Sequence, residues 1–123
     1  QAKLSNLLFQ AAADQNVKAT IQAITENDGA YRAGYHFEEY DINTVAYRLM
    51  DANRFDEAEL IFEFNQKLYP HSWNVYDSYG ELQLRMGNLE NSKALYLKSL
   101  DLNPKNESAK QALDKIAQME AQD

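Results

Sequence analysis

The chain has 123 residues, of which 45% are hydrophobic, and its formal net charge is −7. This length fits one domain with a core of its own. Lys and Arg are scattered along the chain, which argues against binding to nucleic acid or to anionic membranes, because both require clustered basic residues. The absence of cysteine excludes disulfides, thiolate metal sites and a cysteine nucleophile. The sequence shows neither an apolar run that could insert into a membrane nor the pattern of a signal peptide.

The first 28 residues carry two short apolar stripes with helical spacing, separated by Asp14–Asn16. Gly29 suits the left-handed residue that follows a helix end, so we expect a hairpin of two helices. Residues 29–37 are the least regular part of the chain, with two glycines and three aromatic residues. We expect an irregular connector whose rings dock onto neighbouring helices, because exposed aromatic clusters are uncommon. An aromatic ligand surface is the alternative.

The helical signal strengthens from residue 38, and two prolines 34 residues apart, Pro70 and Pro104, divide it. Each of residues 38–70 and residues 71–104 contains two apolar stripes with a break between them, which in the second segment is Gly87-Asn88. A proline cannot continue a helix, so each marks the end of a unit. A 34-residue unit of helix, turn and helix is typical of a helical repeat.

The helix ends of the later part of the chain can also be predicted. Ser72 and Asn88 are expected to cap the two helices of residues 71–104, and the ring of Tyr76 should face inward. Residues 105–123 place their apolar side chains on one helix face, as a capping helix at the end of an array requires. We therefore predict seven helices without a sheet, arranged as an all-α solenoid of about three antiparallel hairpins plus a C-terminal capping helix.

This pattern resembles the tetratricopeptide repeat (TPR) family. In residues 71–104 the matching residues are Tyr76, Gly80, Gly87, Leu89, Ser92, Tyr96, Ser99 and Pro104. In residues 38–70 they are Ile42, Ala46, Phe55, Ala58, Phe62 and Pro70. Asn65 stands where the family has Ala, and Asn53 where it has the turn glycine. The resemblance implies one TPR-like domain over 1–123, as a fragment of a longer chain. Its parts are a degenerate hairpin (1–28), a connector (29–37), two repeats (38–70 and 71–104) and a capping helix (105–123).

A narrower resemblance concerns residues 62–88, FEFNQKLYPHSWNVYDSYGELQLRMGN. This segment is similar to the TPR extension at the C-terminus of some bacterial serine β-lactamase-like hydrolases and esterases. The resemblance implies a catalytic domain upstream of Gln1 and a periplasmic or secreted location, whereas a cytoplasmic location is expected otherwise.

Residues for catalysis, cofactors or metals are not suggested by the sequence. None of the serines lies in a G-x-S-x-G or S-x-x-K motif. His36 and His71 lie in expected connectors without the other ligands that a zinc site needs. The pairs Glu38-Glu39 and Asp56-Glu57 are explained by the helix dipole, which favours acidic side chains in first turns. We expect that this chain alone is not an enzyme and needs no cofactor.

The TPR resemblance implies a concave face, lined by positions two, five, six, nine and twelve of the first helix of each hairpin. The predicted peptide-binding residues are Asn43, Tyr47, Met50, Asn74, Asp77, Ser78 and Glu81. A solvated polar face without a ligand is the alternative. TPR domains that grip acidic chaperone tails use Lys and Arg, but the matching residues here are Asn43, Tyr47, Ser78, Ser108 and Ala112. We therefore do not expect a chaperone-tail clamp, since Asp77 and Glu81 would repel an anionic tail.

The predicted function is that of a protein–protein interaction module whose partner is a protein or a peptide. The alternative is an accessory domain of a serine hydrolase or esterase, which would contact or dimerise its own upstream catalytic domain. A homodimer of this chain is a further alternative.

Overall fold

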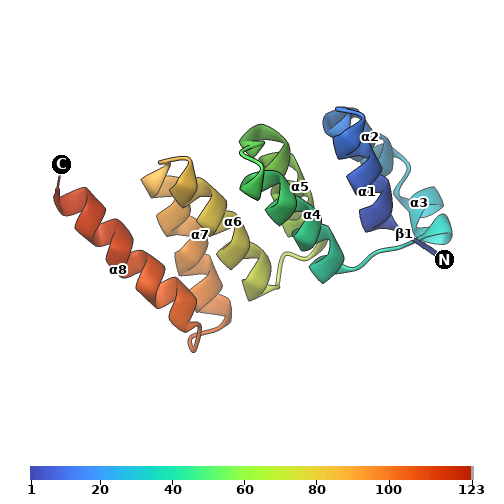
Figure 1. The fold of residues 1–123 in the computed structure, drawn as a ribbon. Helices are drawn as coiled ribbons and strands as arrows, with labels where there is room; N and C mark the ends of the chain where they lie inside the picture. Colours follow the sequence, from blue (N-terminus) through green and yellow to red (C-terminus); the bar gives the residue numbers. More distant parts are fainter. Residues whose placement is uncertain (123) are drawn as a thin grey trace. The chain divides into compact units, whose positions relative to one another are not determined.

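The computed structural model describes residues 1–122, and helices make up most of that part of the chain (Figure 1). Asp123, the last residue of the expected capping segment 105–123, lies outside the described residues. The helices are α1 (Leu4–Ala13), α2 (Val17–Glu26), α3 (Asp28–Gly34), α4 (Glu39–Asp51), α5 (Phe55–Leu68), α6 (Trp73–Arg85), α7 (Leu89–Leu102) and α8 (Glu107–Ala121). The predicted all-α architecture is confirmed, but residues 1–122 contain eight helices and a two-stranded sheet rather than seven helices without a sheet.

The described chain forms two compact units, one over Gln1–Asn65 and one from Gln66 onward. The first unit contains α1 through α4 and most of α5, and the second contains the end of α5 and α6 through α8. In the second unit α6 and α7 lie side by side as a hairpin, and α8 packs mainly on α7 (Figure 1). None of the helices described here is long and apolar enough to cross a membrane.

Each hairpin turns at one residue with a left-handed backbone: Gln15 (φ 58°), Asn53 (φ 61°) and Gly87 (φ 80°). The residue after each of them donates its N–H to the carbonyl five residues earlier. These bonds run from Asn16 to Ala11, from Arg54 to Leu49 and from Asn88 to Gln83, each at 2.9 Å. This arrangement closes a helix C-terminus, and Asn tolerates the left-handed region, so Asn53 can replace the expected glycine.

The structure differs from the prediction at residues 29–37, where an irregular connector was expected. Most of this segment belongs to α3, in which Arg32 pairs with Asp28 at 2.9 Å across one helical turn. The rest pairs as β2 (Tyr35–His36) with β1 (Ala2–Lys3) in a two-stranded parallel sheet. The prediction failed because Gly29 and Gly34 lower helix propensity, whereas the salt bridge and strand contacts are not visible as periodicity.

The rings of residues 29–37 were expected to dock onto neighbouring helices, and the ring contacts found lie within the segment itself. Tyr31 and Tyr35 stack on each other with their centroids 5.8 Å apart, and both are only half-buried. The guanidinium of Arg32 lies 4.5 Å from the ring centroid of Phe37, which is a cation–π contact. These aromatic residues therefore contact one another and a cation at the surface, and α3 contains no buried residue.

Helix capping also differs from the prediction. Ser72 and Asn88 hold the N-cap positions of α6 and α7, but neither side chain makes a capping hydrogen bond. Asn88 instead donates its side-chain amide to Oε1 of Gln83 at 3.0 Å. Asn106 does cap α8, because its Oδ1 accepts the N–H of Ala109 at 3.3 Å.

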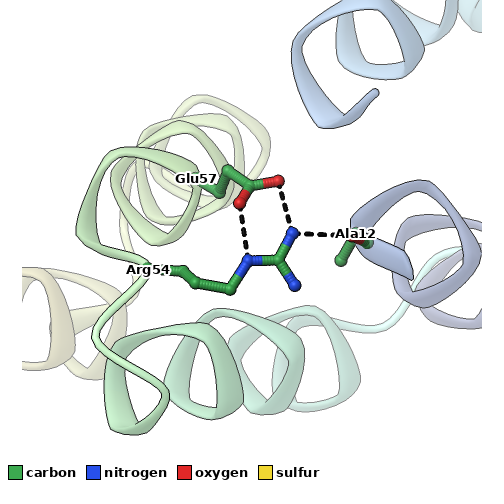
Figure 2. Close-up of polar contacts among 3 residues, drawn as sticks. All are labelled: Ala12, Arg54 and Glu57. Atoms are coloured by element: carbon green, nitrogen blue, oxygen red, sulfur yellow. Dashed lines mark hydrogen bonds and ion pairs between the residues drawn. The ribbon is translucent and has the colours of Figure 1, made fainter. Parts of the chain in front are cut away.

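Arg54 joins the first two hairpins within the first unit (Figure 2). Its guanidinium is held by Glu57, with Nε 2.7 Å from Oε1 and Nη2 2.9 Å from Oε2. Nη2 also donates to the carbonyl of Ala12 at 2.7 Å, in the last turn of α1 (Figure 2). A cation at a helix C-terminus meets carbonyls that have no partner within the helix. Arg54 therefore ties the end of α1 to the start of α5.

We expect Arg54→Met to lower the free energy of unfolding by about 1–2 kcal/mol, because it removes a charged hydrogen bond and a bidentate ion pair while it keeps the apolar stem. The side chain of Arg54 is 35% exposed, so solvent screening reduces the effect. Urea unfolding followed by circular dichroism measures it. Lys110→Met is the control, since it removes an exposed pair with Glu107 and should cost under about 0.5 kcal/mol. Equal losses in the two variants would contradict a joining role for Arg54.

Candidate functional site

The predicted binding residues of the first unit, Asn43, Tyr47 and Met50, all lie on α4. Met50 and Asn43 are buried, with 0% and 7% of their surface exposed, and Tyr47 is half-buried. The ring of Tyr47 meets that of Phe62 edge to face, with centroids 5.6 Å apart and planes at 85°. On this helix, Tyr47 is thus the predicted residue with the most surface to offer a ligand, and it is oriented by a core ring.

The predicted residues of the second unit, Asn74, Asp77, Ser78 and Glu81, all lie on α6. Ser78 is buried, whereas the other three are half-buried. Both acidic groups have partners: Asp77 accepts a hydrogen bond from Asn106 at 3.0 Å, and Glu81 pairs with Arg85 at 3.1 Å. The pair with Arg85 offsets part of the negative charge that the sequence suggested for this face.

Asn106 connects three helices of the second unit. Its Nδ2 donates to Oδ1 of Asp77 on α6 and to Oγ of Ser99 on α7, at 3.0 and 2.9 Å. Oγ of Ser99 donates in turn to the carbonyl of Trp73 at 2.8 Å. Because Asn106 also caps α8, one buried amide sets the positions of α6, α7 and α8 relative to one another.

A depression of about 340 Å³ lies between α6 and α8, and we call it the α6–α8 depression. Its lining residues are Glu81, Leu84, Arg85, Lys115 and Met119. Of these, only Glu81 was among the predicted binding residues. Leu84 is position twelve of α6 and Lys115 is position nine of α8, so the positional rule of the TPR resemblance, applied to both helices, would have found them.

The described residues offer little for metal binding. No group of three or more His, Cys, Asp and Glu side chains within residues 1–122 is arranged to hold a metal ion. Of the two histidines, His36 lies at the surface with Nε2 3.4 Å from Oε2 of Glu38.

Comparison with known proteins identifies the fold. No protein-family model matches the sequence, and neither does any curated protein. Among solved structures, the chain is similar to the first TPR domain of Spaghetti (RPAP3) bound to the HSP90 peptide SRMEEVD, with a TM-score of 0.65 and 22% sequence identity. The match covers 95% of this chain and 87% of that one. At this identity the likeness shows the fold alone, and the fold of this chain is a TPR-like all-α helical repeat.

Proposed function

We propose that this chain is a protein–protein interaction module that binds a peptide on the first-helix faces of its hairpins and has no catalysis of its own. The observation that carries the proposal is the α6–α8 depression, which opens between α6 and α8 and contains apolar and charged side chains together. Such mixed depressions suit peptide side chains, because apolar contact supplies affinity and a few charges supply orientation.

The predicted binding residues divide by exposure. Tyr47, Asn74, Asp77 and Glu81 retain surface for direct contact with a ligand. The buried side chains of Asn43, Met50 and Ser78 would act by holding α4 and α6 in shape. The similar TPR domain binds an HSP90 peptide, which supports a peptide as the class of ligand. The lack of basic residues at the clamp positions of this chain still disfavours an acidic chaperone tail.

The accessory role beside a serine hydrolase rests on the resemblance of residues 62–88 alone, and the comparisons add no support to it. The same holds for a homodimer. Neither alternative is carried by a contact or a surface of the described residues, so the interaction module is the proposal we develop.

The test is a selection of peptides from a random displayed library, followed by fluorescence anisotropy with the selected peptides. We expect Tyr47→Ala or Asn74→Ala to weaken binding by about tenfold, the scale of a residue at the centre of an interface. Leu97→Ala is the control, since Leu97 is 50% exposed on α7 and outside the proposed faces. Circular dichroism verifies that each variant is folded. The proposal is wrong if no selected peptide binds more tightly than about 1 mM, or if both variants bind as well as the Leu97 control.

A further inference from the structure

We propose that the α6–α8 depression recognises a peptide in which an apolar residue stands next to a Glu or Asp. The apolar side chain would enter between Leu84 and Met119, and the carboxylate would meet Lys115. This inference rests on the proposed function and adds to it a subsite and a class of ligand. It needs no free C-terminal carboxylate, because any acidic side chain can pair with Lys115.

The apolar part of the depression comes from Leu84 on α6 and Met119 on α8, both half-buried. Leu84 also packs against the core cluster of Tyr96, Ala109 and Ile116, which holds it in place. Met119 is unbranched and can adapt to the shape of a ligand. At about 340 Å³ the volume is near the lower end of ligand pockets, so it suits one side chain of a longer peptide.

The charges around this depression favour an anion. Glu81 is already paired with Arg85 at 3.1 Å, whereas Lys115 is exposed and forms no ion pair with any residue from 1 to 122. The lining thus contains one carboxylate and two cations, although the chain as a whole has a net charge of −7. A carboxylate beside Lys115 would complement this local excess, and a basic ligand would be repelled by it.

Of the neighbouring acidic groups, which include Asp114 directly before it on α8, none forms an ion pair with Lys115 in residues 1–122. On α8, Glu107 pairs with Lys110 at 3.3 Å and Glu120 pairs with Lys93 at 3.9 Å. On α6, Asp77 is hydrogen-bonded to Asn106. Lys115 is therefore the cation of this surface that a ligand can engage without breaking an ion pair of the described chain.

The test uses nuclear magnetic resonance titrations of the whole chain with capped tetrapeptides. The probes are acetylated and amidated Ala-Leu-Glu-Ala, its Gln and Lys counterparts at the third position, and Ala-Ala-Glu-Ala. We expect the Leu-Glu peptide to shift the signals of Lys115 and of the Met119 methyl group. It should bind roughly two- to fivefold more tightly than the Leu-Gln peptide, and the Lys peptide should bind most weakly. Added salt should reduce this preference.

Two substitutions separate the subsite from general charge effects. Lys115→Met should abolish the preference for Glu over Gln, whereas Lys110→Met, on the same helix, should keep it. The inference is overturned if the Leu-Glu and Leu-Gln peptides bind with equal affinity, or if Ala-Ala-Glu-Ala binds as tightly as Ala-Leu-Glu-Ala. It is also overturned if the peptide shifts only NMR signals of helices other than α6 and α8. If library-selected peptides still bind elsewhere on the chain, the proposed function survives that result. If neither selected nor short peptides bind, both proposals fail.

Discussion

Tyr76→Ala should lower the free energy of unfolding by about 3–5 kcal/mol, the usual cost of truncating an aromatic residue in a core. The ring is 7% exposed on α6, and its hydroxyl donates a hydrogen bond of 2.8 Å to the carbonyl of Pro70. Alanine would leave a cavity under α6 and a carbonyl without its donor. Urea unfolding measured by circular dichroism gives the free energy directly.

Tyr76→Phe separates these two contributions, because it keeps the ring and removes only the hydroxyl. We expect a loss of about 0.5–1.5 kcal/mol, the net value of one hydrogen bond. A loss below about 1 kcal/mol in the alanine variant would place the ring at the surface and contradict the register of the repeat.

Asn106→Ala should give the second large effect, because we expect it to lower the free energy of unfolding by about 2–3 kcal/mol. The substitution removes the cap of α8, worth about 1 kcal/mol, and the donor shared by Asp77 and Ser99, worth about 1–2 kcal/mol. Asn106 is 6% exposed, so water replaces these bonds poorly. Thermal and urea unfolding of the variant measure the loss.

Asn106→Ser is the matched variant, because a serine oxygen can still cap α8 but its hydroxyl cannot replace both amide donations. We expect its stability to fall between those of the native chain and Asn106→Ala. A serine variant as stable as the native chain would show that only the cap matters and that the bonds to Asp77 and Ser99 contribute nothing.

The hairpins could be predicted because their signals are local. Apolar spacing marks the buried face of each helix, and the turns fall where Gly87, Asn53 and Gln15 interrupt that spacing. The departure at Asn65, in contrast, is explained by a contact with another helix, α4. This buried amide donates to the carbonyl of Glu39 at 3.1 Å, so a polar residue can replace the expected alanine.

The rest depends on contacts between distant residues. Asp77 and Asn106 are 29 residues apart, and no periodicity connects a helix-face carboxylate to a later N-cap. The pairing of Lys3 with His36 in the small sheet is equally invisible in the sequence. The α6–α8 depression combines positions from two helices, whereas the predicted binding residues came from α4 and α6, so Lys115 on α8 was not among them.

The bond from Arg54 to Ala12 has a consequence for how the chain opens. In a helical repeat each hairpin is stabilised mainly by its neighbours, so one hairpin can open before the next. Arg54 follows the turn of the second hairpin yet holds the last turn of α1 in the first. Fraying of the first hairpin must therefore break a charged hydrogen bond that belongs to the second. Local opening of the first hairpin therefore involves both hairpins, because the turn of the second protects the end of α1.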